Sequence, residues 1–120
     1  MSLAKVESKT RFYPLAVFSS ASKGEQIIKP YVLWTEKRIF VLKKFLKCVI
    51  EKKNEVWYVT NKDLEIEVFE PTKREAEVGF AEVFNELYEI YVLEDDSKLS
   101  RGAVELKKEI ESYISMVYEQ

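Results

Sequence analysis

The chain of 120 residues contains no histidine, one cysteine, three glycines and three prolines. Without histidine it lacks imidazole metal ligands and a histidine general base, and a single cysteine excludes an internal disulfide. Its longest run without a charged residue, Phe12–Ser22, is shorter than a membrane span, and no charged and then apolar leader precedes it. We therefore expect a cytoplasmic protein in which Cys48 is a small buried hydrophobic residue.

Glutamate and lysine dominate the polar residues. The chain has 18 Glu and 15 Lys but only five Asn and Gln together. A surplus of charged residues over heat-labile amides is typical of hyperthermophile proteins, although an ordinary domain with a Lys- and Glu-rich surface has the same composition. With 47% hydrophobic residues, a chain of this length is expected to form one globular domain.

The first two predicted strands are Arg11–Phe18 and Ile27–Trp34, which are rich in aromatic and branched residues. Pro14 and Pro30 each remove a backbone donor, so we expect these strands to lie at an edge or to be interrupted.

A hairpin is predicted for Glu55–Thr60 and Leu64–Phe69, with residues 61–63 as its turn. Apolar residues and glutamates alternate in its second strand, which is the pattern of a sheet with one solvent-facing side. A three-residue turn places Trp57 on the glutamate side and a two-residue turn places it on the other, so its face stays open.

Three helices are predicted. Thr35 is a possible cap for a helix that runs to about Lys53, the segment Pro71-Thr72 opens a second helix over Lys73–Tyr91, and a third starts near Ser100. The apolar stripe of the first of these helices comprises Ile39, Leu42, Leu46, Val49 and Ile50.

The last helix carries an apolar seam with steps of three and four residues, the spacing of a short coiled coil. The seam comprises Ala103, Leu106, Ile110, Tyr113 and Val117. We predict residues 98–120 to be a C-terminal oligomerisation helix and residues 1–97 to be a single α+β domain. In that domain a four-stranded antiparallel sheet packs with two helices.

The charges are sorted along the chain. Residues 1–53 hold 12 basic and 4 acidic residues, a net charge of +8, whereas residues 54–120 hold 7 basic and 17 acidic residues, a net charge of −10. The two parts either neutralise each other, within or between subunits, or present opposite surfaces to partners.

In the predicted helix of residues 35–53, Lys37, Phe40, Lys44 and Lys47 follow one another at spacings of three, four and three, with Lys43 alongside. This pattern surrounds a ring with ammonium groups, which hold phosphates without regard to base sequence. A solvated lysine face with the Phe40 ring covered by neighbouring loops is the other interpretation.

Arg11, Tyr13, Lys29 and Tyr31 alternate with bulky apolar neighbours in the first two predicted strands. Because side chains alternate across a strand, one face of each strand can be basic and aromatic, and the strand register decides whether the two faces coincide. Unpaired bases stack on rings while cations follow the phosphates. Trp57 is a further candidate for stacking, and a place in the core is the alternative for each ring.

The sequence contains no catalytic signature. Asp63, Glu65 and Glu67 have a spacing compatible with a metal ion, but the signal is weak, and the chain has no glycine-rich phosphate loop. The second predicted helix carries a stripe of glutamates, which is the pattern of a solvated face. The stripe comprises Glu75, Glu82, Glu86 and Glu89. We predict no resident metal, no cofactor and no enzymatic activity.

A basic, aromatic sheet and helix followed by a heptad-patterned helix is similar in plan to the ThermoDBP-related proteins of hyperthermophilic archaea. The residues that carry the resemblance are Arg11-Phe12-Tyr13, Lys29-Pro30-Tyr31, the face from Lys37 to Lys47 and the seam from Ala103 to Val117. The resemblance implies that the protein binds single-stranded nucleic acid in a cleft lined with basic and apolar residues. It also implies assembly through a C-terminal helix. The acidic second half departs from a uniformly basic binder.

The first hypothesis is a non-enzymatic, low-specificity binder of single-stranded DNA or RNA that forms a homo-oligomer. Its candidate binding residues are Arg11, Tyr13, Lys29, Tyr31, Lys37, Phe40, Lys43, Lys44, Lys47 and Trp57. The second hypothesis is an oligomeric interaction or scaffold protein whose opposite charges dock subunits or a protein partner. A more distant third is a metal-dependent nuclease that uses Asp63, Glu65 and Glu67.

Overall fold

The computed structural model describes residues 11–19, by their backbone, and residues 25–120. The strands are β1 (Arg11–Ser19), β2 (Glu25–Trp34), β3 (Arg38–Leu42), β4 (Cys48–Lys53), β5 (Val56–Asn61), β6 (Ile66–Glu70) and β7 (Ile114–Glu119). The helices are α2 (Lys73–Leu87), the π-helical turn η1 (Tyr88–Val92) that continues it, the short 3-10 turn η2 (Asp96–Lys98) and α3 (Arg101–Tyr113).

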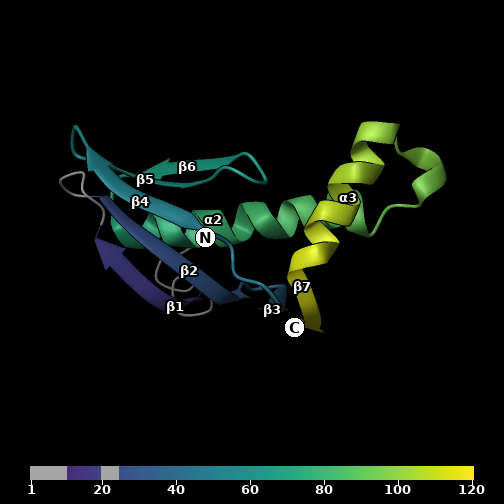
Figure 1. Ribbon diagram of the computed structural model, residues 1–120, viewed down its shortest axis with the longest axis horizontal. Coiled ribbons are helices and arrows are strands. Elements are labelled where there is room, and N and C mark those ends of the chain that lie inside the picture. The colour runs from purple at the N-terminus through teal and green to yellow at the C-terminus, as the bar shows by residue number, and fades with distance from the viewer. Residues whose placement is uncertain (1–10, 20–24) are drawn as a thin grey trace.

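The seven strands of the described residues form one antiparallel sheet, shown in Figure 1. β2 lies at its centre, with β1 along one edge and both β3 and β4 along the other. β5 and β6 extend the sheet from β4, and β7 extends it from β3. The predicted α+β class and the first two strands are confirmed, but the prediction of only four strands is wrong.

The helix predicted over Thr35–Lys53 does not form, because its residues make β3, a loop and β4. Phe40 and Leu42 are buried while Ile39 is only partly buried, so the run has the period of a strand. A short apolar run does not separate helix from strand by periodicity alone. Thr35 closes the β2–β3 turn: its Oγ1 accepts a hydrogen bond from the Arg38 N–H at 2.9 Å and donates one to the Arg38 carbonyl at 2.9 Å.

The predicted hairpin of residues 55–69 is confirmed as β5 and β6, although its connection spans residues 62–65 rather than 61–63. The β4–β5 turn is tight, because Lys53 pairs with Val56 and only two residues lie between them. Those residues, Asn54 and Glu55, have positive φ angles of 50° and 64°. A two-residue hairpin loop of this kind requires positive φ at both positions.

The C-terminal helix predicted for residues 98–120 ends early. Ser100 caps α3 by accepting a hydrogen bond from the Ala103 N–H at 3.2 Å, but the helix ends at Tyr113 and the chain continues as β7, which pairs with β3. The predicted seam lies inside the molecule: Ile110 and Tyr113 belong to the core, and Leu106 and Val117 pack against it. The seam residues that reach the core are therefore not an interface between subunits.

The second predicted helix is confirmed by α2 and its continuation η1. Thr72 caps α2 by accepting a hydrogen bond from the Glu75 N–H at 3.1 Å. α2 lies against β5 and β6 and also against β1, so the sheet curls around it (Figure 1). Gly79 permits this contact, because a Cβ at that position would lie 2.8 Å from Cγ1 of Val68.

The core fills the space between the inner face of the sheet and the helices. Phe40, Phe80 and Phe84 are fully buried in it, and the Phe40 ring meets those of Phe84 and Tyr88 edge-on at centroid distances of 5.1 Å. Every helix in residues 25–120 is too short or too polar to cross a membrane. We call the opposite side of the sheet, which faces away from α2, the outer face.

Candidate functional site

A loop rich in lysine interrupts the sheet beside the middle of β2. We call Lys43, Lys44, Phe45, Leu46 and Lys47 the basic loop; it joins β3 and β4, which both pair with the same edge of β2. The pairing runs from Ile28 opposite Cys48 to Val32 opposite Val41, and residues 29–31 lie in the gap. Pro30, at the centre of that gap, has no backbone N–H that would be left without a hydrogen-bond partner. The interruption expected from this proline is confirmed for β2, and it leaves the basic loop opposite residues 29–31.

The backbone of the basic loop is held at both ends. Leu46 is fully buried and serves as its apolar anchor. The buried Asn61 side chain donates from Nδ2 to the Lys47 carbonyl at 3.0 Å and accepts at Oδ1 from the Leu64 N–H at 2.8 Å. The Lys43 N–H donates to the Tyr113 carbonyl at 2.8 Å. The loop is therefore positioned by β5, the connection that follows β5, and α3.

The lysines of the basic loop are exposed and keep their charge available. Lys43, Lys44 and Lys47, and nearby Lys62, form no ion pair within the described residues. The Nζ of Lys44 lies 4.3 Å from the centre of the Tyr113 ring, which is a cation–π contact. Lys43, Lys44 and Lys47 share the basic loop, and Lys47 and Lys62 line one hollow.

Tyr113 and Asp63 form a supporting pair beneath these lysines. The Tyr113 hydroxyl donates to Asp63 Oδ2 at 3.0 Å. Burial, and then the hydrogen bond to the carboxylate, raises the pKa of Tyr113 to about 12. Tyr113 therefore stays protonated near neutral pH and keeps donating to Asp63.

Aromatic rings stand beside these cations. The Nζ of Lys29, on β2, lies 4.9 Å from the centre of the Phe45 ring, which is 42% exposed. Tyr31, which also lies in the gap of β2, is 40% exposed. The basic loop and residues 29–31 together present rings and ammonium groups to solvent.

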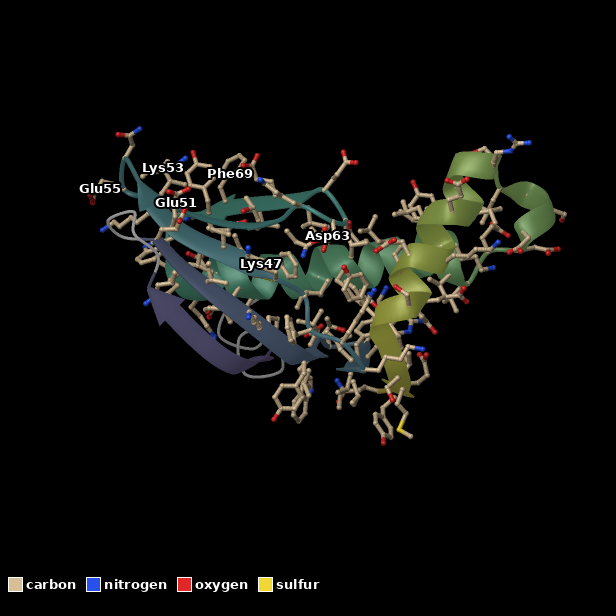
Figure 2. All side chains as sticks on the ribbon, in the orientation of Figure 1. Lys47, Glu51, Lys53, Glu55, Asp63 and Phe69 are labelled. Atoms are coloured by element: carbon tan, nitrogen blue, oxygen red, sulfur yellow. The ribbon has the colours of Figure 1, made fainter. Side chains whose placement is uncertain are left out.

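A second group of rings lies further along the outer face. Tyr58 and Phe69 are paired across β5 and β6 with ring centres 5.7 Å apart, and we call them the ring pair. Phe69 is 62% exposed, and the Nζ of Lys53 lies 5.6 Å from the centre of the Tyr58 ring. Figure 2 shows Lys53 and Phe69 toward one end of β4–β6, with Lys47 toward the other end of β4.

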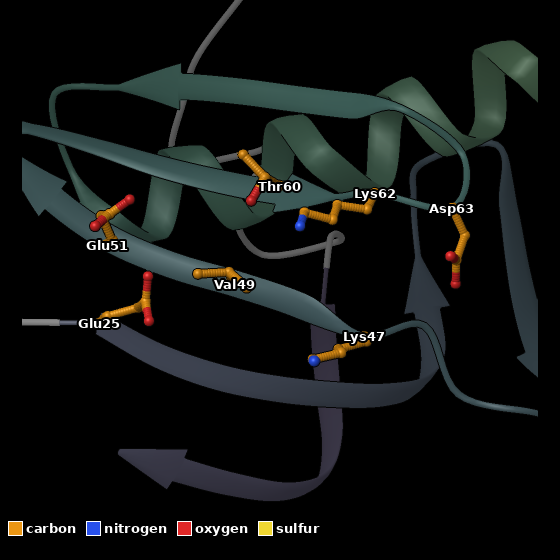
Figure 3. A pocket seen from close by; sticks show the side chains of 7 residues that line it. All are labelled: Glu25, Lys47, Val49, Glu51, Thr60, Lys62 and Asp63. Carbon is orange, nitrogen blue, oxygen red and sulfur yellow. The ribbon is translucent and has the colours of Figure 1, made fainter. Parts of the chain in front are cut away.

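A hollow of about 430 Å³ lies on the outer face between the basic loop and the ring pair. Figure 3 shows its lining, with the carboxylates of Glu25 and Glu51 at one end and Lys47, Lys62 and Asp63 nearer the other. The lining residues are Glu25, Lys47, Val49, Glu51, Thr60, Lys62 and Asp63. The basic loop, the hollow and the ring pair form one continuous candidate site.

The structure brings together half of the predicted binding residues. Lys29, Tyr31, Lys43, Lys44 and Lys47 lie around the gap in β2. The backbones of residues 11 and 13 lie in β1, but the side chains of Arg11 and Tyr13 are outside the described residues.

Three predicted binding residues lie elsewhere. Phe40 is fully buried in the core, Trp57 packs against the core on the same face as Val59, and Lys37 lies 3.6 Å from Glu89 in an ion pair. The prediction of a ring surrounded by lysines was wrong because it assumed helical spacing. In β3 the alternation of a strand turns Phe40 inward.

Sequence reasoning missed Phe45, Lys53, Tyr58, Lys62 and Phe69. A signal for Phe69 was present, since the alternation in the predicted second hairpin strand places it on the same side as the glutamates. No comparable signal existed for Phe45, because its exposure depends on where the strand breaks.

The acidic groups take other roles. Among the residues the structure describes, no set of three or more acidic or cysteine side chains is arranged to hold a metal ion, so Asp63, Glu65 and Glu67 are not brought together. On α2, burial raises the pKa of Glu82, and nearby carboxylates, led by that of Glu36, add to the shift.

The comparisons of this chain with protein-family models, with curated proteins and with solved structures find no match.

Proposed function

We propose that this protein is a non-enzymatic, low-specificity binder of single-stranded DNA or RNA. The observation that carries the proposal is a group of four exposed lysines, without ion pairs in the described residues, in and beside the basic loop, next to the exposed rings of Phe45 and Tyr31. The resemblance in plan to ThermoDBP-related proteins points to the same class of ligand.

The basic loop supplies the electrostatic part of binding. Lys43, Lys44, Lys47 and Lys62 neutralise phosphates and release the cations condensed on them, so the affinity falls as salt rises. Because contacts to phosphates carry no information about the base, this part is insensitive to sequence. The buried anchors Leu46 and Asn61 hold the loop in place, so binding costs little conformational entropy of the loop.

The exposed rings account for the preference for single strands over duplexes. Unpaired bases stack on aromatic side chains with about 1–3 kcal/mol per base, whereas bases in a duplex are already stacked. Phe45 and Tyr31 serve this purpose beside the basic loop, and Phe69 serves it on the ring pair. A nucleic-acid strand that follows the outer face contacts the rings beside the basic loop and those of the ring pair.

The test is a titration of a mixed-sequence single-stranded oligonucleotide of about 15 nucleotides, at about 50 mM and about 200 mM salt. The double variant Lys43→Glu with Lys47→Glu is expected to bind at least about tenfold more weakly. Its plot of log affinity against log salt is expected to be shallower by about 2.

The matched control is Lys98→Glu with Lys108→Glu, which makes the same charge change on η2 and α3, away from the basic loop. We expect it to retain most of the affinity. An equal loss in both double variants would mean that only net charge matters, and no binding by the parent protein at low salt would refute the proposal.

Self-association is a second candidate function, favoured by the exposed edge of β7. β7 ends the strand order of the described sheet and has no charged residue from Ile114 to Tyr118. Met116 and Tyr118 are each 50% exposed. Edge strands that stay single usually carry a charge or a proline, so β7 is suited to pair with the β7 of a second copy.

A further inference from the structure

The hollow on the outer face has two chemically different ends. Glu25 and Glu51 lie directly opposite each other across β2 and β4 at one end (Figure 3). Lys47 and Lys62 lie nearer the other end, together with Asp63, which accepts a hydrogen bond from the Tyr113 hydroxyl. Val49 lies between them, so the middle of the hollow is apolar on its β4 side. Residues 47 and 51 are about 13 Å apart along the chain, at about 3.3 Å per residue.

The carboxylate end has unused hydrogen-bonding capacity. Lys53 Nζ lies 3.2 Å from Oε1 of Glu51 and occupies one side of that carboxylate. The Glu25 carboxylate forms no ion pair within the described residues. Two like charges directly opposite each other in a sheet repel, so a hydrogen-bond donor placed between them is attracted by both.

A nucleotide complements both ends of the hollow. Its phosphate matches the ammonium groups of Lys47 and Lys62, the flat base covers Val49, and the edge of the base reaches the carboxylates. Cytosine, adenine and guanine present an amino group at that edge, and carboxylates accept from such groups. An amino group has two N–H bonds and can donate to both carboxylates. Thymine and uracil have a carbonyl oxygen at the position of the cytosine amino group, which a carboxylate repels, and only the single N3–H to donate.

Resting on the proposed binding of single strands, we infer that the hollow selects nucleotides whose base carries an exocyclic amino group and disfavours thymine and uracil. Glu25 and Glu51 are the residues that read the base, and the lysines of the hollow hold its phosphate. The preference acts at one nucleotide position, so most of the affinity stays independent of sequence.

The experiment compares oligo-dC with oligo-dT of equal length, about 15 nucleotides, on the full chain. The two probes have the same backbone and differ in the amino or carbonyl group, in the hydrogen on N3 and in the thymine methyl group. The parent protein is expected to bind oligo-dC about tenfold more tightly. The variant Glu25→Gln with Glu51→Gln is expected to reduce this ratio to about 2 or less, because the neutral amides discriminate less.

The matched control is Glu65→Gln with Glu67→Gln, which removes the same two charges from exposed positions outside the hollow. It is expected to raise the affinity for both probes and to keep their ratio. Equal binding of oligo-dC and oligo-dT by the parent protein would overturn the inference while leaving the proposed function intact. A ratio that survives in Glu25→Gln with Glu51→Gln would also overturn it, and no binding of either probe would refute both proposals.

Discussion

Phe40 and Phe69 show how two residues of the same type take opposite roles. Phe40 is fully buried between β3 and the end of α2, where its ring contacts those of Phe84 and Tyr88. Phe69 is 62% exposed on the outer face beside Tyr58. Strand alternation and the position of α2 produce this difference, because each ring faces either the helix or solvent.

Alanine at each of these positions is expected to have a different consequence. Phe40→Ala leaves a cavity in the core and should lower the free energy of unfolding by about 3–5 kcal/mol. Phe69→Ala removes an exposed ring, and it should change stability little but weaken single-strand binding about tenfold through lost stacking. Urea unfolding and oligonucleotide titration on both variants measure the two effects. Unchanged binding by Phe69→Ala would show that the ring pair lies outside the binding surface.

At the scale of elements, Arg38 joins β3 to α2, η1 and β7. Its Nη1 donates to Glu89 Oε2 at 2.5 Å and to Asn85 Oδ1 at 3.0 Å, and its Nε donates to Glu119 Oε2 at 2.9 Å. The hydrogen bond from Arg38 lowers the pKa of Glu89 below its ordinary value of 4.5. The charged form of Glu89 is therefore favoured in the folded protein.

This shift predicts a pH dependence of stability. A carboxyl group with a lowered pKa stabilises the fold fully above its ordinary pKa, and that contribution is lost as pH falls through the lowered value. Glu89→Gln should therefore be less stable than the parent near pH 7, and the difference should shrink toward pH 3. Urea unfolding at several pH values tests this, and a difference that stays constant down to the acid range would exclude the linkage.

The exchange of the predicted first helix for β3, the basic loop and β4 also belongs to this scale. The lysines, the apolar residues and Thr35 were all identified, but they were assigned to a helix. The residues fit the periodicity of a helix and also that of a strand. Backbone hydrogen bonds to the open edge of β2 favour the strand. The choice moved Phe40 inward and left Lys43, Lys44 and Lys47 in one loop.

At the scale of the whole molecule, ion pairs join the two oppositely charged parts of the chain. Lys37 and Arg38 pair with Glu89, and Arg38 also pairs with Glu119, so part of the opposite charge is neutralised internally. The basic loop takes no part in these ion pairs within the described residues. The charge that remains unpaired there is what the proposed ligand uses.

Assembly is also a property of the whole molecule, and β7 provides its test. Met116→Lys places a charge on the exposed edge strand and is expected to convert a β7-paired dimer to a monomer in sedimentation velocity experiments. Ile90→Lys, at another exposed apolar position, is the control and should leave the sedimentation unchanged. A parent protein that sediments as a monomer, or a dimer that survives Met116→Lys, would contradict pairing through β7.

The sequence by itself determined those features that depend on short-range pattern. They are the α+β class, the first two strands, the hairpin of β5 and β6, α2, the start of α3 near Ser100 and the sorting of charge along the chain. The sorting of charge follows from composition, and the others follow from capping, turn chemistry or periodicity within about 20 residues.

The tertiary structure alone decided what became of the apolar runs at residues 39–50 and 114–118. Each run fits a helix locally, but the first run pairs with β2, β5 and β7 and the second pairs with β3. The same pairing set which lysines and rings share the outer face and where the hollow lies. Burial and strand pairing are long-range terms, and only the assembled sheet determines them.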